Sequence, residues 1–281
     1  MSARAPYWLR KLLHNRVGLL GLIIVAVVIL VAVLAPWVSP QDPNFTEMAD
    51  KLIPPLTRGH LLGTDQLGRD ILARIIWGSR ISLGIGIYAV VVSGIIGVAV
   101  GLVAGFYGGW IDTIAMRIVD VQLSFPFILL ALVLNGILGP GFRNLVITLI
   151  ISSWVTYARL ARGEVLAVRH KEFVLAAGAL GMRDWRIMIR HILPNIITPV
   201  IVVSSLNLAQ LIVAEAAISF LGFGVQPPQI SWGNMLSEGR DYLINAWWLA
   251  TFPGLALAFA SLGINLTGDW LRDTLDPKLK L

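Results

Sequence analysis

Two long stretches without a charged residue constrain the fold of this chain more than any other feature. They are residues 17–38 and 81–111, and each is long enough to cross the hydrocarbon of a bilayer, which takes about 20 helical residues. The composition agrees, because 57% of the 281 residues are hydrophobic and only 14% are charged, far from the balance of a soluble domain. The chain is therefore predicted to be an integral membrane protein.

Six transmembrane helices are predicted, so the fold class is all-α with one long cytoplasmic loop. The further apolar segments lie near residues 121–138, 145–160, 196–221 and 247–266. With the N-terminus inside, the inner segments carry 15 lysines and arginines and the outer segments carry seven, so both termini are predicted to be cytoplasmic. Glu215, in the fifth span, is predicted to lie near the outer surface in a structural role rather than in a proton relay.

The chain divides into four predicted parts. An interfacial helix occupies residues 1–16, where basic residues alternate with aromatic and leucine side chains and no acidic residue occurs. The first span follows at 17–39, an external loop at 40–80, and a core of five further spans at 81–281. A cleavable signal peptide is the alternative for the start of the chain, but the apolar run is too long and lacks a small-residue cleavage site.

Small residues recur every four positions in the second span, at Ser93, Gly97, Gly101 and Gly105. Such a stripe lets another helix pack closely in a membrane. The string GIGIYA at Gly84 superficially resembles a dinucleotide fingerprint, but it lies inside a membrane helix without the strand that such a motif follows. The stripe is therefore predicted to be a helix-packing surface.

The sequence carries no recognisable catalytic machinery. It has no GxxxxGK[ST] motif, so this chain is not predicted to hydrolyse ATP. Its four histidines are scattered without metal-ligand spacing, and it contains no cysteine. We therefore predict no catalytic residue, no metal site and no cofactor bound by this chain.

Residues 171–195 form the most charged long stretch between two apolar blocks. Residues 172–180 favour a helix, and Gly181 can take the positive φ at which a helix ends. Asp184 is predicted to cap a second short helix at 185–192, and Pro194 marks the next apolar run. We expect two helices at an angle, with three arginines on one side and a small apolar face on the other. That face is predicted to consist of Ala176, Ala177, Ala179 and Leu180.

Three functions fit these residues taken alone: contact with a partner protein, DNA binding, and a plain cytoplasmic loop without a partner. Ala177, Gly181 and Ile187 have the spacing of the turn in a DNA-binding helix-turn-helix, and the nearby arginines suit phosphates. Both ends of the segment are tied to membrane spans, however, so the helices would have to contact a DNA groove against a bilayer. Membrane lipid is therefore a predicted partner, and nucleic acid is not.

The run AAGALG, followed by nine residues and HILP, resembles the EAA loop of bacterial ABC importer permeases. Five positions fall in register with that pattern: Ala176, Ala177, Gly181, Leu193 and Pro194. Leu175 stands where the strict pattern has Glu, and His191 stands at an Ile position. Both departures resemble the dipeptide, oligopeptide and nickel branch of the family.

Two further segments are similar to the same branch. The string GTDQLGRD in the external loop matches a motif that follows the first span of these permeases. The matching residues are Gly63, Thr64, Asp65, Gly68, Arg69 and Asp70. They are predicted to form an ordered turn, a docking site for a substrate-binding protein, or both. In residues 106–126, which also resemble the branch, Arg117 and Asp120 are predicted to pair on one helix face.

The resemblance extends from Arg10 to Lys280 and implies a permease subunit of an ABC importer in the bacterial inner membrane. The implied partners are a second homologous permease, two ATPase subunits that use ATP and Mg, and a substrate-binding protein. The implied cargo is di- or oligopeptides, with glutathione or nickel chelates as alternatives for the same machinery. A secondary transporter that needs no ATPase is the alternative of a different class.

In such permeases a coupling helix sits in a cleft of an ATPase subunit. The resemblance places this coupling helix at residues 172–191. The residues expected to couple to the ATPase are Glu172, Ala176, Ala177, Gly181, Met182, Arg183, Asp184, Trp185 and Pro194.

Overall fold

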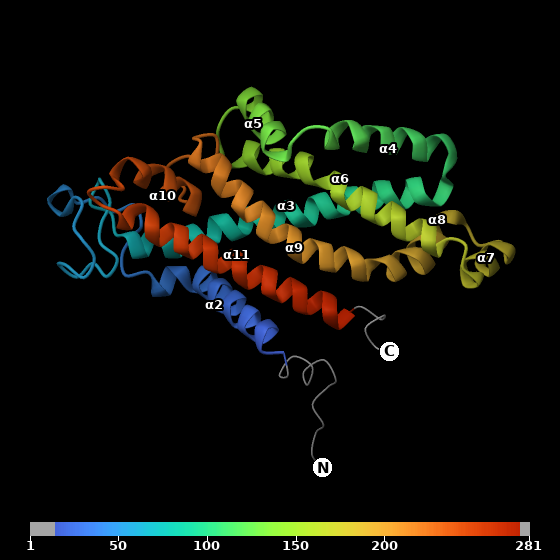
Figure 1. Cartoon of the computed structure of the whole chain (residues 1–281), viewed down its shortest axis with the longest axis horizontal. Coiled ribbons are helices and arrows are strands. Elements are labelled where there is room, and N and C mark those ends of the chain that lie inside the picture. Colours follow the sequence, from blue (N-terminus) through green and yellow to red (C-terminus); the bar gives the residue numbers. More distant parts are fainter. Residues whose placement is uncertain (1–14, 276–281) are drawn as a thin grey trace, which may run out of the picture.

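The computed structural model describes residues 15–275, which form a bundle of long helices with no β-strand in that range (Figure 1). The long helices are α2 (Arg16–Val38), α3 (Ile71–Tyr107), α6 (Phe142–Val168), α9 (Leu193–Phe220) and α11 (Trp248–Leu275). The shorter helices are α4 (Gly109–Leu123), α5 (Phe127–Leu138), α7 (Glu172–Ala179), α8 (Asp184–Ile187) and α10 (Trp232–Gly239). Three further short helical segments occur in the described residues: the 3₁₀ helices η1 (Met48–Asp50) and η3 (Arg240–Tyr242), and the π-helix η2 (Met188–Ile192).

The number of spans agrees with the prediction. Within the described residues, five helices are long and apolar enough to cross a membrane, and α4 with α5 makes a sixth span if the pair counts as one. α7 and α8 lie at one end of the bundle, and the segment after α2 lies with α10 at the opposite end (Figure 1). The interfacial helix predicted at 1–16 falls almost entirely outside the described residues.

The third span differs from the single helix predicted at 121–138. It consists of two helices, α4 and α5, that meet at a bend of 90°. Pro126 explains the break, because proline has no amide hydrogen for the helix ladder and disfavours helical geometry at the residue before it. α4 begins well before the predicted span, at Gly109, and α5 is only 12 residues long.

α3 and α6 pack so closely that only glycine fits where they cross. A Cβ atom on Gly97 would lie 2.3 Å from the Trp154 carbonyl oxygen, and one on Gly101 would lie 2.3 Å from the Ala158 carbonyl oxygen. A Cβ on Gly105 of α3 would lie 2.8 Å from the Val165 Cβ of α6. The small-residue stripe is therefore confirmed as a helix-packing surface.

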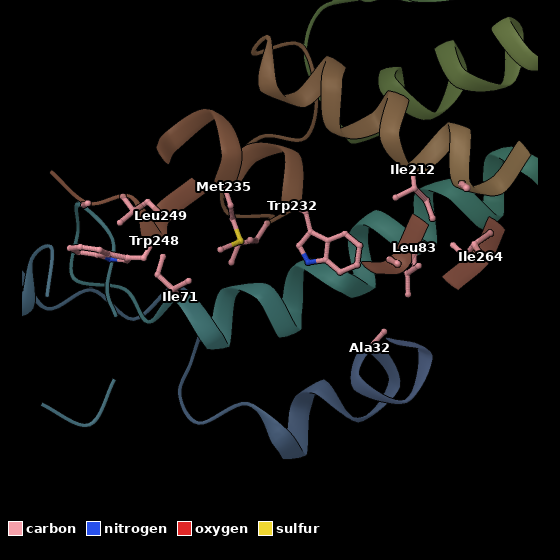
Figure 2. Close-up of a cluster of buried hydrophobic side chains, with 13 residues drawn as sticks. Ala32, Ile71, Leu83, Ile212, Trp232, Met235, Trp248, Leu249 and Ile264 are labelled. Atoms are coloured by element: carbon pink, nitrogen blue, oxygen red, sulfur yellow. The ribbon is translucent and has the colours of Figure 1, made fainter. Parts of the chain in front are cut away.

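A buried apolar cluster joins five helices near the end of the bundle that holds α10. Its members include Ala32, Ile71, Leu83, Ile212, Trp232, Met235, Trp248, Leu249 and Ile264 (Figure 2). They come from α2, α3, α9, α10 and α11, so α10 is packed into the core rather than left as a surface loop. The cluster fixes this end of the molecule as one unit.

Glu215 lies near the end of α9, at the end of the bundle that holds α10, and its contacts agree with the predicted structural role. Its side chain is fully buried between helices, five residues before the end of α9. The carboxylate accepts hydrogen bonds from the hydroxyl groups of Ser219 at 2.8 Å and Ser82 at 3.0 Å, and the Ser82 oxygen accepts one from the Trp232 amide at 3.2 Å. The neighbouring α3 and α10, which the sequence does not place here, cover the residue. Its contacts join three helices.

The predicted pair of Arg117 with Asp120 is replaced by a contact between helices. Asp120 accepts a hydrogen bond from Arg159 of α6 at 2.6 Å, because α6 runs beside α4 and presents a guanidinium at that height. About two helical turns earlier in α4, Asp112 binds Arg162 through both carboxylate oxygens, with 2.6 Å between Oδ2 and Nη2. These two ion pairs attach α4 to the half of α6 that leads into α7.

Candidate coupling surface and outer loop

The turn between α7 and α8 has the geometry that the sequence predicts. α7 ends at Ala179, one residue before the predicted end, and Gly181 has a φ of +76°, in the region that favours glycine. The Met182 amide donates to the Ala177 carbonyl at 3.1 Å, and the Gly181 amide donates to the Gly178 carbonyl at 2.9 Å. These bonds satisfy carbonyl groups that the end of α7 would otherwise leave free.

The second helix differs from the prediction at both ends. α8 begins at Asp184, but Arg183 holds the cap position and the Asp184 side chain makes no capping bond. The helix does not stop at residue 192, because one π-helical stretch, η2, continues it directly into α9. Pro194 is tolerated there as one of the first residues of α9, where its missing amide costs little. α8 is thus rigidly joined to a membrane span.

One side of this element is packed against the membrane helices. Val174 and Ala177 of α7 and Ile187 and Met188 near α8 are all buried. They form a cluster with the ends of α3 and α6, whose members there are Leu102, Ala161, Val165 and Val168. Ala177 therefore belongs to the inner side and not to the small exposed face predicted for it, because the α7 helix turns it toward α6. Displacement of α7 must also move these helix ends.

The opposite side exposes large apolar groups. Leu180 is 86% exposed, Leu175 58% and Trp185 51%, and Phe173 is also exposed. The Arg186 guanidinium lies over the Trp185 ring at 5.3 Å. Apolar side chains grouped on a protruding element are typical of a protein-binding surface. We call the exposed sides of α7 and α8 the coupling surface.

The residues predicted for coupling fall into two groups. The exposed ones are Glu172, Ala176, Gly181, Arg183, Asp184, Trp185 and Pro194. Met182 is half-buried and Ala177 is buried. Leu180 is exposed, as predicted for the apolar face, whereas sequence reasoning missed Leu175 and Phe173 as contact candidates. The sequence did show apolar side chains beside the predicted turn. Hydrophobic periodicity alone, however, does not tell which side of a short helix packs against the protein.

The outer loop is held by buried polar contacts. The Thr64 hydroxyl accepts from the Ile53 amide at 2.8 Å and donates to the Asp50 carbonyl. Asp70 caps α3 by accepting from the Ala73 amide at 2.8 Å, and its other oxygen contacts His60 Nδ1 at 2.8 Å. These contacts agree with the ordered-turn alternative.

The same burial limits what the predicted docking residues can contact. Thr64, Asp65 and Asp70 are each at most 3% exposed, Gly63 and Gly68 are buried with positive φ, and Arg69 is half-buried. Their direct contact with a binding protein stays a prediction. The exposed side chains of this loop, such as Leu56 at 82% and Leu61 at 58%, are the ones that a docked protein would touch first.

A buried ion network links this loop to α10. Arg74, at 2% exposed, donates to Asp65 at 2.6 Å and to both oxygens of Glu238, the closer at 2.6 Å. Arg69 donates to Asp65 at 2.6 Å and to Glu238 at 2.9 Å. Sequence reasoning missed Arg74 and Glu238 because 164 residues separate them and neither belongs to a motif. The network fixes α10 against the start of α3.

The network predicts a loss of stability in acid. Burial alone would raise the pKa of Glu238, but the hydrogen bonds and charges of Arg74 and Arg69 outweigh it and hold the pKa below its ordinary value. A carboxylate with a lowered folded pKa adds stability above its unfolded pKa, about 4.3, and this stability is lost as pH falls through the folded pKa. Glu238→Gln is therefore expected to cost about 2 kcal/mol at pH 7 and progressively less as pH falls through that range.

Thermal unfolding of the purified protein at pH 7 and at a series of pH values below about 4.3 checks this expectation. The curves of wild type and Glu238→Gln should converge as the pH falls. Asp241→Asn is the matched control, because Asp241 pairs with Arg240 on the surface and both side chains are more than half exposed. A stability difference between wild type and Glu238→Gln that stayed constant with pH would contradict the role given to the carboxylate.

Two family models match this chain. The model described as "Binding-protein-dependent transport system inner membrane component" matches residues 97–281. The model described as "N-terminal TM domain of oligopeptide transport permease C" matches residues 7–55. The first match includes the whole coupling surface, and the second includes α2.

Curated relatives are similar over nearly the whole chain. The di/tripeptide transport system permease protein DppC of Pseudomonas aeruginosa is 43% identical over 284 residues, which cover 99% of this chain and 93% of the relative. The glutathione transport system permease protein GsiD of Pectobacterium atrosepticum is 42% identical, with 99% and 93% covered. The dipeptide transport system permease protein DppC of Haemophilus influenzae is 40% identical, with 95% and 92% covered.

The fold is also similar to that of a solved structure. A chain from an inward facing conformation of the MetNI methionine ABC transporter aligns with a TM-score of 0.58 and 17% identity. The alignment covers 72% of this chain and 96% of that chain.

Proposed function

This chain belongs to the family of binding-protein-dependent transport system inner membrane components, and from that premise we propose that it is one permease subunit of an ATP-driven importer of di- or oligopeptides. The chain itself carries no ATP-binding motif. ATP and Mg are therefore used by partner ATPase subunits. The proposed location is the bacterial inner membrane, with both termini in the cytoplasm.

The observation that carries the coupling part of the proposal is the exposed apolar surface on α7 and α8. It protrudes at one end of the bundle, and its inner side is packed into the ends of α3 and α6. A partner protein that binds this surface can therefore move the membrane helices. We propose that the ATPase subunit is this partner, with the exposed Leu180 and Trp185 at the centre of the contact.

The geometry suggests how such movement would spread. α7 follows α6 after a few residues, and α8 continues through η2 into α9. The ion pairs Asp112–Arg162 and Asp120–Arg159 connect α4 to α6, so α4 is expected to move with α6. When ATP drives the two ATPase subunits together, the cytoplasmic halves of α4, α6 and α9 would move as a group. This is a rigid-body switch between inward and outward access, biased by a bound partner.

The remaining partners follow from the same assignment. A second, homologous permease completes the membrane pathway, and a substrate-binding protein delivers cargo at the end that holds the outer loop. Peptides are the favoured cargo because dipeptide and di/tripeptide permeases are among the relatives at 40–43% identity. Glutathione is the second candidate, since a glutathione permease is 42% identical. Nickel chelates remain an alternative for the same machinery.

The experiment that tests the proposed function is gentle purification of the tagged chain from its native membrane, with identification of the co-purifying proteins by mass spectrometry. We expect a second permease and ATPases that carry the GxxxxGK[ST] motif. Proteoliposomes with these subunits and the binding protein should take up trialanine only with ATP. A chain that purified alone, bound no added ATPase and transported without ATP would favour a secondary transporter.

A further inference from the structure

A cavity of about 590 Å³ lies where the α4–α5 bend faces α6 and α9. Ser152 and Thr156 come from the middle of α6, and Asn207 and Gln210 come from the middle of α9. Because both helices cross the membrane, the cavity lies near the midplane of the bilayer. Its volume is within the range of roughly 300–1,000 Å³ that is usual for ligand sites.

The polar part of the lining is entirely neutral. It consists of Gln122, Ser152, Ser153, Thr156, Asn207 and Gln210, and none of the other lining residues is charged. Ser152 and Ser153 are 6% and 3% exposed, and within the described part of the chain their hydroxyl oxygens have no hydrogen-bond partner. Unpaired hydroxyl groups at membrane depth are unfavourable. These two oxygens are covered by neighbouring atoms, so a bound molecule would first meet the exposed side chains of Thr156 and Gln210.

Hydrogen bonds hold other polar groups of the lining in place. The Gln122 side chain donates to the Ile151 carbonyl at 2.6 Å and accepts from the Trp154 ring at 3.0 Å. The Asn207 amide donates to the Tyr157 hydroxyl at 3.2 Å. The cavity is also lined by Phe127 and Ile128, the first two residues of α5. The first backbone amides of a helix have no hydrogen-bond acceptor within that helix. Broken membrane helices of this kind often carry transport sites.

We propose that this cavity binds the backbone amide groups of a peptide during translocation, an inference that rests on the proposed function. Hydroxyl and carboxamide groups both donate and accept, so they match the C=O and N–H groups that every peptide presents. Since no lining residue is charged, side chains of either sign meet no specific partner. One site can therefore pass peptides of different sequence.

A shallow, open groove along α4 adjoins the cavity on the side toward the end that holds α7. The two share Gln122, Phe125 and Leu130, and the second reaches Arg117, which lies earlier in α4. The peptide path would thus run along α4 from the bend to the coupling end. Arg117 supplies a cation on that path, and it suits the carboxylate of a departing peptide.

Cysteine accessibility tests whether the cavity is open to water and cargo. The chain has no cysteine of its own, so Thr156→Cys and Gln210→Cys introduce single reactive sites in this subunit. The matched control is Val27→Cys, in the middle of α2, where the side chain is 53% exposed on a membrane helix. All variants are assembled into the complete importer in proteoliposomes and treated with a water-soluble methanethiosulfonate reagent.

The expected result is labelling at the two cavity positions and none at Val27→Cys. Trialanine, supplied with the binding protein and ATP at a few times its apparent Kd, should slow labelling of the cavity positions by about three- to tenfold, because labelling needs the unoccupied cavity. Unlabelled cavity cysteines would overturn the proposal, because a lipid chain or a helix of the second permease would then fill the space. Labelling that trialanine does not slow would overturn it too.

Removal of the exposed polar groups tests the hydrogen bonds themselves. Thr156→Val and Gln210→Leu together should raise the KM for trialanine uptake by about three- to tenfold while ATP hydrolysis stays stimulated by the binding protein. Ser79→Ala is the control, because Ser79 does not line the cavity and its hydroxyl already donates to Ile76 of its own helix at 2.6 Å.

The two levels of inference fail in different ways. If the wild-type complex took up trialanine and the Thr156→Val, Gln210→Leu double variant had the same KM, only the backbone-binding site would be wrong. If the wild-type complex took up neither trialanine nor dialanine with ATP, the proposed peptide import would be wrong, and so would the proposed peptide site.

Discussion

Gly181→Trp is expected to abolish ATP-driven uptake while the protein still inserts into the membrane and assembles. Gly181 has a φ of +76°, and inside this chain a Cβ at this position would meet no atom within 4 Å. The indole would therefore project away from the bundle, toward whatever covers the coupling surface. We expect uptake to fall by roughly 100-fold, equivalent to roughly 3 kcal/mol of lost coupling. Uptake and ATP hydrolysis in proteoliposomes, with membrane yield as the folding check, measure the effect.

Two controls separate the bulk of the indole from backbone strain. Gly181→Ala carries the cost of a non-glycine residue at positive φ, roughly 1–2 kcal/mol, with little added volume, and it should lower uptake only a few-fold. Gly109→Trp has a φ of +56° and equally open surroundings, but it lies in the α3–α4 turn rather than on the coupling surface. It carries the same backbone strain, so it should lower uptake only a few-fold, like Gly181→Ala. Normal uptake by Gly181→Trp would remove the basis for placing an ATPase on α7 and α8.

The parts of this region that the sequence predicted well depend on local chemistry. A residue with positive φ must end α7, and Gly181 was the only glycine placed to do so in the predicted turn. The continuation of α8 into α9 was not predictable in the same way. Pro194 signals a boundary in the sequence, yet a proline within the first residues of a helix satisfies the same steric rule. Packing of Ile187, Met188 and Ile192 against α6 decides between the two outcomes.

The same distinction applies to the membrane helices. Length and hydropathy gave the number of spans, but the 90° angle at Pro126 depends on where α6 and α9 hold α4 and α5. The neutral cavity beside the bend was missed because its polar residues are spread from Gln122 to Gln210 and follow no motif. Glu215 was placed by counting residues along one helix, which cannot reveal that α3 and α10 cover it. Contacts between distant segments are what a single sequence leaves open.

The second large effect is expected at the crossing of α3 and α6. Gly97→Leu should destabilise the folded bundle by about 3 kcal/mol or more, at the upper end of the cost of overpacking. The reason is that even a Cβ atom would lie 2.3 Å from the Trp154 carbonyl oxygen and 2.5 Å from the Tyr157 Cβ. Backbone cannot rotate away like a side chain, so the two helices must separate. Size-exclusion profiles of the detergent-solubilised protein, recorded after heating to a series of temperatures, measure the loss.

Gly84→Leu is the matched control for this variant, because it places the same side chain on the same helix. A Cβ at Gly84 would meet no atom within 4 Å, so leucine there fills open space and also replaces a poor helix former. We expect Gly84→Leu to melt at or above the wild-type temperature and Gly97→Leu to lose its folded peak at far lower temperature. Equal melting of the two variants would mean that close contact between α3 and α6 does not hold the bundle together. The proposal that a rigid group of helices carries movement from the coupling surface would then be unsupported, because α6 contacts the rest of the bundle mainly through α3.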